Sequence, residues 1–184
     1  MKNRNSGDAG MKYDPAQVRV HEEYTVAIRD LGVHGEGIGS LDGFTIFVPG
    51  ALPGETVTAE ITLLKKSYAV GELLSIEQES PFRVVPECPV YEHCGGCQLS
   101  HLAYEGQLDM KYRRVKDVIE RIAGESGDVV KPVLPAAHPF AYRNKMAVPA
   151  GLVKGKAALG CYRQGSHDII PVSSCAIQKE ENNR

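Results

Sequence analysis

Residues 88–97 read CPVYEHCGGC and carry three cysteines with the spacing C-x5-C-x2-C. Two glycines separate Cys94 from Cys97, and glycine allows the tight backbone turn that lets both thiols face one point. Of the 5 cysteines in the chain, Cys161 and Cys175 lie far downstream. Thiols that converge on one point constrain the backbone that carries them. We therefore expect this stretch to determine how the second half of the chain folds.

Three interpretations of these thiols are open. Three clustered cysteines and a remote one are a frequent arrangement for an iron–sulfur cluster, which is the interpretation we favour. A zinc site with three cysteines would need a nitrogen ligand, for which His93 and His101 are the candidates. Three unrelated buried thiols are the third interpretation. A thioredoxin-like motif would need a βαβ context that this region lacks, and an odd cysteine count without a secretory signal argues against a disulfide framework.

The composition predicts a soluble globular protein. The chain has 184 residues, 42% of them hydrophobic and 24% charged, which suffices for one or two small domains. The longest apolar runs are too short to cross a membrane, and no secretory signal opens the sequence. We therefore expect a cytoplasmic protein without a membrane partner, in a compartment that keeps thiols reduced and able to bind metal.

The charge is unevenly distributed along the chain. Its net value of -2 argues by itself against nucleic acid binding. Residues 17–80 hold 4 basic and 10 acidic side chains, whereas residues 129–167 hold basic side chains and no acidic ones. The acid-free stretch favours an anionic partner, although chance clustering on a solvated surface would give the same pattern.

Residues 17–80 show the pattern of a small all-β domain, after a polar tail over residues 1–16 that we expect to be disordered. Hydrophobic and polar residues alternate in short runs, and Asp42-Gly43 between two apolar runs is a strong hairpin signal. Five short strands predict a closed or partly closed barrel. The glycines at 35, 37 and 39 resemble half of a dinucleotide fingerprint, but no helix pattern follows, which favours a closely packed strand.

Residues 81–184 predict a small mixed domain, so the fold class is α+β. A Pro-punctuated linker leads into the cysteine loop, and an amphipathic stripe then predicts a helix that ends near Gly124 and has a solvated charged face. The stripe consists of Leu108, Tyr112, Val115, Ile119 and Ile122. Strands over 140–148, 157–163 and 168–172 should form an antiparallel ribbon that exposes Arg143, Lys145 and Arg163 and ends just before Cys175.

Together these motifs resemble the RNA uracil-5-methyltransferases of the ribosomal RNA and tRNA type. The barrel with GEGIG at 35–39 and FVPG at 47–50 resembles a TRAM domain, an OB-like RNA-binding module. The cysteine loop, YRNKM at 142–146 and GSHDIIPVSSC at 165–175 resemble the central domain of that family, so the likeness spans about residues 20–178. The resemblance implies that Cys88, Cys94, Cys97 and Cys175 hold a [4Fe–4S] cluster, to which we assign a folding role.

The sequence also departs from the family. Members continue into a SAM-binding Rossmann-like domain with a catalytic cysteine, and no strand–glycine–helix unit follows Cys175. Cys161 has no base near it in sequence, so we expect a buried, inert thiol. The resemblance thus implies the RNA-recognition part of a methyltransferase, binding ribosomal RNA or tRNA, inactive alone and dependent on a separate catalytic domain for SAM.

The residues that could contact RNA phosphates are the basic side chains of two regions. They are Lys65, Lys66, Arg143, Lys145 and Arg163. Two other functions remain open at this point: a stand-alone RNA-binding module with a structural metal, and an electron-transfer or redox-sensing protein that uses the same cluster.

Overall fold

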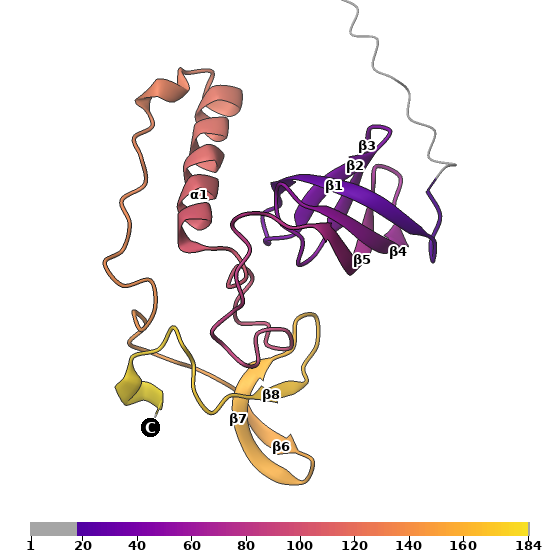
Figure 1. The fold of residues 1–184 in the computed structure, drawn as a ribbon. Coiled ribbons are helices and arrows are strands. Elements are labelled where there is room, and N and C mark those ends of the chain that lie inside the picture. Colours follow the sequence, from indigo (N-terminus) through magenta and orange to yellow (C-terminus); the bar gives the residue numbers. More distant parts are fainter. Residues whose placement is uncertain (1–17, 184) are drawn as a thin grey trace, which may run out of the picture. The chain divides into compact units, whose positions relative to one another are not determined.

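The computed structural model describes residues 18–183, which belong to two compact units (Figure 1). The first unit ends at Pro81 and the second begins at Phe82. The tail over residues 1–16, predicted to be disordered, lies outside the described residues. None of the helices described is long and apolar enough to cross a membrane.

The first unit is a closed five-stranded barrel, as the sequence predicts. Its strands are β1 (Glu23–Leu31), β2 (Gly37–Leu41), β3 (Phe44–Val48), β4 (Thr56–Leu64) and β5 (Tyr68–Gln78). They follow one another around the barrel in the order β1-β2-β3-β5-β4. All neighbours are antiparallel except β3 and β5, which are parallel. The alternating pattern thus predicts the strands, whereas the order around the barrel comes from the structure.

The hydrophobic core lies inside this barrel. Alternate side chains of each strand point inward, the periodicity expected for a strand with one buried face. The core residues are Val18, Val26, Ile28, Phe44, Ile46, Val48, Ala51, Val57, Ala59, Ile61 and Ala69. Burial of these side chains is the main stabilising contribution to the barrel.

The glycine-rich strand β2 packs closely against β1. A Cβ atom on Gly39 would lie 2.3 Å from Cγ1 of Val26 and 2.7 Å from the backbone oxygen of Ala27. Only glycine fits at this position, because β2 lies so close to the backbone of β1. The glycines therefore serve a closely packed strand, as the sequence favours, rather than a dinucleotide-binding motif. The Asp42-Gly43 turn joins β2 to β3 with φ values of 46° and 88°, the left-handed conformation of a tight hairpin.

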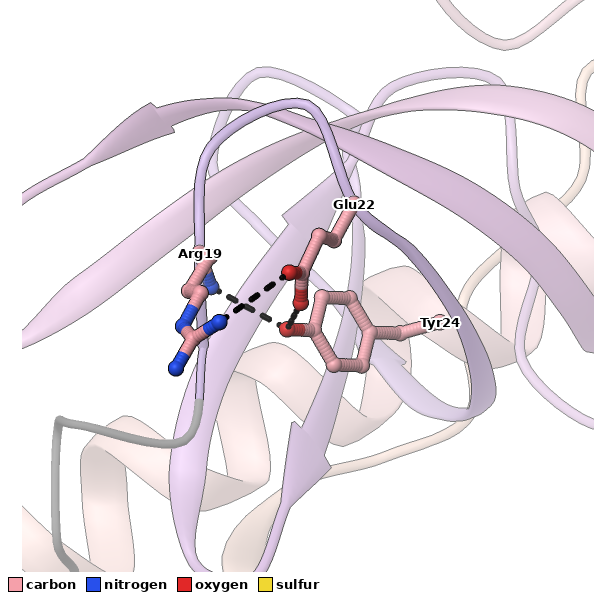
Figure 2. A network of polar contacts seen from close by, with 3 residues as sticks. All are labelled: Arg19, Glu22 and Tyr24. Atoms are coloured by element: carbon pink, nitrogen blue, oxygen red, sulfur yellow. Dashed lines mark hydrogen bonds and ion pairs between the residues drawn. The ribbon is translucent and has the colours of Figure 1, made fainter.

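A small polar network holds the segment that precedes β1 (Figure 2). The Tyr24 hydroxyl donates a hydrogen bond to Oε2 of Glu22 at 2.8 Å and accepts one from the backbone N–H of Arg19 at 3.1 Å. Nη1 of Arg19 lies 3.6 Å from Oε1 of Glu22. Partial burial raises the pKa of Tyr24, and its hydrogen bond to the Glu22 carboxylate adds to the rise. The tyrosine hydroxyl thus stays a donor at neutral pH and ties the start of the barrel together.

Glu55 is a buried carboxylate, only 1% exposed, that joins three parts of the barrel. Its Oε2 accepts a hydrogen bond from the backbone N–H of Leu52 at 2.8 Å, and its Oε1 accepts one from Ser80 at 3.3 Å. Its backbone oxygen accepts a hydrogen bond from Ile28 at 2.8 Å. The side chain therefore fixes the loop before β4 and the segment after β5.

The second unit contains one long helix and a three-stranded sheet. Helix α1 (Tyr104–Val118) continues as a π-helical turn over Ile119–Ala123 and ends at Gly124, where φ is 71°. A 3-10 turn covers Gly127–Val129, and another covers Glu180–Asn183. Strands β6 (Ala150–Val153), β7 (Lys156–Tyr162) and β8 (Ile169–Pro171) form an antiparallel sheet in the order β6-β7-β8. The predicted helix and ribbon are confirmed as elements.

The predicted strand over 140–148 is wrong. Within that range a single parallel bridge joins Arg143 to Gln178, and the first strand of the ribbon is β6 instead. The N–H of Arg143 donates to the oxygen of Ile177 at 2.9 Å, and the N–H of Lys179 donates to the oxygen of Arg143 at 3.0 Å. The segment thus pairs with the chain's last residues, which are distant in sequence.

Apolar side chains of the second unit remain largely uncovered. Leu102 is the one buried hydrophobic residue of this unit among those that the structure describes. In the predicted stripe of α1, Val115 is 52% exposed and Ile122 is 81% exposed. The charged face of α1 carries ion pairs such as Arg113 with Asp109 at 2.6 Å, as expected for a solvated surface. Unlike the barrel, this unit has no hydrophobic core of its own within residues 82–183.

We predict that replacing Glu55 by Gln destabilises the protein by about 1–3 kcal/mol, because one of two buried backbone N–H groups would face an amide nitrogen instead of an oxygen. Urea unfolding followed by far-UV circular dichroism measures the loss. The matched control is Glu72→Gln, at an exposed position of β5, which should change stability by less than about 0.5 kcal/mol. Equal effects of the two substitutions would contradict the structural role of Glu55.

Candidate metal centre and nucleic-acid interface

All five cysteines of the chain line one pocket in the second unit. Cys88, Cys94 and Cys97 come from the loop after the first unit, Cys161 from β7, and Cys175 from the segment after β8. The pocket is partly open to solvent. All five thiols are free and partly buried. The structure therefore brings together the four cysteines singled out in the sequence and adds Cys161, which the sequence analysis set aside.

The ends of the cysteine loop are held together by backbone pairing. Residues 82–84 pair with residues 101–103, through a bridge between Arg83 and Leu102 and a hydrogen bond of 3.0 Å from the N–H of Val84 to the oxygen of His101. Within the loop, the N–H of Cys94 donates to the oxygen of Val90 at 2.8 Å. The two ends of the loop thus lie side by side.

Gly95 attaches this loop to the sheet. Its N–H donates to the oxygen of Tyr162 in β7 at 2.9 Å. A Cβ atom at this position would lie 2.7 Å from that oxygen and 2.9 Å from the backbone nitrogen of Gln164. Only glycine allows such a close approach of two backbones, so the first glycine of the CGGC sequence has a packing role as well as a turning role.

Cys175 is positioned by the C-terminal 3-10 turn. Its N–H donates to Oδ1 of Asn183 at 2.9 Å, and its carbonyl oxygen accepts from Nδ2 of the same residue at 3.3 Å. The N–H of Gln178 donates to the carbonyl oxygen of Cys175 at 3.0 Å. These contacts hold the remote cysteine at the pocket that also contains the cysteines of the loop.

The electrostatics of the pocket combine raised thiol pKa values with basic side chains. Burial raises the pKa of the Cys97 thiol. Burial also raises the pKa of Cys161 to about 11, and the Cys94 thiol beside it adds to the rise. Arg143 and Lys145 line the same pocket. The protein thus places cationic groups at a site where thiolates would form if a metal displaced their protons.

The histidines that a zinc site would need do not line the pocket. Neither His93 nor His101 is among its lining residues. His101 is buried, and its Nδ1 lies 2.5 Å from the hydroxyl of Tyr91. Within residues 18–183, no group of three or more His, Cys, Asp or Glu side chains is arranged to hold a metal ion.

The basic residues predicted to contact RNA lie in three surroundings. Lys65 and Lys66 are exposed in the turn between β4 and β5. Arg143 and Lys145 lie at the cysteine pocket. Arg163 faces Asp168, with Nε and Oδ2 3.9 Å apart, and so is already ion-paired.

An aromatic pair lies beside the lysine turn and was not singled out in the sequence. The rings of Phe47 on β3 and Tyr68 on β5 meet edge to face, with centroids 5.5 Å apart. The N–H of Lys65 donates to the oxygen of Tyr68 at 2.8 Å, which sets the lysine turn next to this pair. The parallel neighbours β3 and β5 create the pair, so local sequence offered no signal for it.

We predict that Gly95→Ala releases the cysteine loop from β7, because the new Cβ would clash with two backbone atoms. A lost hydrogen bond costs about 1 kcal/mol, so the pocket thiols should react with iodoacetamide about fivefold faster in the reduced protein. The control is Gly96→Ala, whose Cβ would meet only the Cys94 and Cys161 sulfurs at 3.4 and 3.5 Å. Unchanged labelling rates in Gly95→Ala would contradict the proposed attachment.

Comparison with known proteins identifies both parts of the chain. The TRAM domain family matches residues 17–74. An uncharacterized RNA methyltransferase of Bacillus cereus is 48% identical over 165 residues, which cover 90% of this chain and 36% of the relative. A similar protein of Halalkalibacterium halodurans is 41% identical over 174 residues, or 95% of this chain and 38% of the relative.

Among solved structures, the tRNA (uracil-54, C5)-methyltransferase of Pyrococcus abyssi, crystallised with S-adenosyl-L-homocysteine, is 26% identical with a TM-score of 0.59. The likeness covers 86% of this chain and 34% of that protein. The chain thus spans about a third of the length of the relatives it matches. The chain therefore contains a TRAM domain and is homologous to the N-terminal third of RNA methyltransferases.

Proposed function

We propose that this chain is the RNA-recognition part of an RNA (uracil-C5) methyltransferase, with a [4Fe–4S] cluster that holds its second unit together. The observation that carries the proposal is the pocket in which the cysteines of a loop and the remote Cys175 meet, in a unit without a hydrophobic core. Homology to RNA methyltransferases supports the enzyme class, and the P. abyssi structure supports uracil-C5 as the target.

The donor set of the pocket fits an iron–sulfur cluster better than a single ion. Its potential ligands are thiols, the ligands that clusters take, and the candidate histidines lie elsewhere. A four-iron cluster is larger than one ion, so its cysteines need not converge on one point, which accommodates the lack of a compact ligand group in the described chain. The cluster would supply covalent links among its ligands. Arg143 and Lys145 would offset its negative charge.

The role that we propose for these links is structural. Leu102 is the one buried hydrophobic residue described in the second unit, and small units with little core need cross-links or metals to remain folded. A link between Cys88 and Cys175 would remove about 4–5 kcal/mol of unfolded-state freedom in the loop-closure model. That contribution is comparable to the net stability of a small domain.

RNA would contact the barrel at the lysine turn. The rings of Phe47 and Tyr68 offer an edge-to-face surface beside two exposed lysines, a combination suited to a stacked base and its phosphates. The barrel is otherwise acidic, so binding would be confined to this patch. Arg143 and Lys145, exposed in the acid-free stretch of the second unit, would provide a further phosphate contact.

Methyl transfer would require a SAM-binding domain supplied outside residues 18–183. The described units are a small barrel and an antiparallel sheet with one helix, neither of which has the parallel βαβ architecture that binds the cofactor in this enzyme class. The raised pKa of Cys161, about 11, leaves little thiolate at neutral pH, which disfavours a role as catalytic nucleophile although it still permits slow thiol–disulfide exchange. We therefore assign no catalytic residue to these units.

The cluster assignment predicts a metal and sulfide content. Anaerobically purified and reconstituted protein should contain about four iron and four sulfide ions per chain and absorb near the visible bands of such clusters. Serine at Cys88, Cys94, Cys97 or Cys175 should lower the iron content by more than half. Cys161→Ser, a thiol in the same pocket, is the matched control and should retain iron. Zinc without iron or sulfide would contradict the assignment.

The RNA assignment predicts separable effects on affinity. Phe47→Ala or Tyr68→Ala should each weaken binding of a uridine-containing RNA by about 1–3 kcal/mol, the value of one stacked base. The double variant of Lys65 and Lys66 to Ala should also lower the salt dependence of binding by about two counterions. Filter binding at several salt concentrations measures both quantities.

The control is the double variant of Lys111 and Lys116 to Ala, which removes the same charge from α1 and should leave affinity within about twofold. Arg143→Ala with Lys145→Ala tests the second contact separately. Equal losses in the control and the lysine-turn variant would show that net charge, rather than the patch on the barrel, governs binding.

A further inference from the structure

Cys161 is the thiol that the proposed cluster does not use, although it lies in the same pocket. It comes from β7, a different element from the loop that carries Cys94. Both sulfurs lie within about 3.5 Å of the position that a Cβ on Gly96 would occupy, at 3.4 Å for Cys94 and 3.5 Å for Cys161. The pocket thus contains a facing pair of thiols from two separate segments.

The backbone holds this pair in place. The hydrogen bond from Gly95 to Tyr162, 2.9 Å long, joins the residues that immediately follow Cys94 and Cys161. The N–H of Gly96 also donates to the Cys94 sulfur at 3.4 Å, which directs that side chain. Adjacent, hydrogen-bonded segments bring the backbones of two cysteines close together, which is what a disulfide needs if it is to form with little backbone movement.

The other thiols have different partners. The Cys97 thiol lies near Ser100 in its own loop. Cys175 is held through its backbone by Asn183 on the far C-terminal turn. The Cys161 sulfur lies beside the Cys94 sulfur at Gly96, where no other thiol of the pocket is in contact. The geometry therefore favours Cys94 as the partner of Cys161 over the remaining thiols of the pocket.

We propose that Cys94 and Cys161 form an intramolecular disulfide when the pocket holds no cluster, and that this bond blocks cluster assembly until it is reduced. The proposed disulfide depends on the facing thiols alone, whereas the proposed block on cluster assembly rests on the proposed function. The bond would tie the cysteine loop to β7 in a unit that lacks a core, and so protect the cluster-free protein. It would also remove Cys94 from the set of available ligands.

A low-molecular-weight disulfide such as oxidised glutathione is the oxidant for this step. One protein thiolate attacks a glutathione sulfur, forms a mixed disulfide and releases one reduced glutathione. The second protein thiol then displaces the other glutathione and closes the Cys94–Cys161 bond. Two electrons pass from the protein to the oxidant, and the two thiol protons end on the two released glutathione molecules.

The first experiment maps the bond in the full, reduced and cluster-free chain after treatment with oxidised glutathione. Free thiols are alkylated, and trypsin then separates residues 84–111, 157–163 and 164–179, which carry the loop cysteines, Cys161 and Cys175 respectively. We expect the loss of two alkylatable thiols per chain and a link between fragments 84–111 and 157–163. A link from 84–111 to 164–179, a stable glutathione adduct or five alkylated thiols would overturn the proposal.

Variants identify the partner within the loop. Cys94→Ser and Cys161→Ser should each abolish the link, whereas Cys88→Ser, a loop thiol in the same tryptic fragment, should retain it. Cys161→Ala provides a second variant for the case that serine disturbs β7. Retention of the link in Cys94→Ser would exclude Cys94 as the partner.

The second experiment measures iron and sulfide uptake before and after oxidation. Oxidised wild-type protein should take up less than half of the iron that reduced protein takes up, and a thiol reductant should restore uptake. Cys161→Ser should load equally with and without oxidant treatment. Equal loading of oxidised and reduced wild type would overturn the block, whereas failure of every reduced variant to load iron would reject the cluster and leave the mapped disulfide as an independent result.

Discussion

The second unit depends on one close backbone contact, between Gly95 in the cysteine loop and Tyr162 in β7. The absence of a side chain at Gly95 lets the loop lie directly against the sheet, and the resulting hydrogen bond brings cysteines from distant parts of the sequence to one pocket. A larger residue there would separate the loop from the strand. Every chemical property that we assign to the pocket follows from this proximity, because thiols act together only when the backbone delivers them to the same place.

The two units are stabilised by different means. The barrel buries alternate side chains of five strands and satisfies the backbone of one loop with the carboxylate of Glu55, so that it has both a core and an internal hydrogen-bonding group. The second unit buries one large apolar side chain in the part of it that is described, and otherwise relies on backbone pairing between distant segments. Such a unit suits the cross-linking cluster that we propose, for which Cys88, Cys94, Cys97 and Cys175 would be the ligands. The facing pair Cys94 and Cys161 would provide a second form of cross-link in the cluster-free protein.

Charge placement reconciles an acidic chain with the RNA partner that we propose. The net charge of -2 is an average over an acidic barrel and a basic stretch in the second unit. Locally, two exposed lysines flank an aromatic pair on the barrel, and Arg143 and Lys145 lie beside the thiols. Affinity for a polyanion depends on such local groups, since charges separated by more than a Debye length are screened.

Sequence alone determined the elements whose signals are local: the five strands and the Asp42-Gly43 hairpin from alternation and turn chemistry, and the helix that ends at Gly124 from its apolar stripe. It also pointed to the RNA methyltransferases, and the comparisons show a TRAM domain and homology to the N-terminal third of such proteins. Only the tertiary structure decided the pairing of residue 143 with residue 178, the Phe47–Tyr68 pair and the contact of Cys161 with Cys94. The physical reason is that each of these contacts joins segments far apart in the chain, whose meeting depends on the folded backbone rather than on any periodicity within either segment.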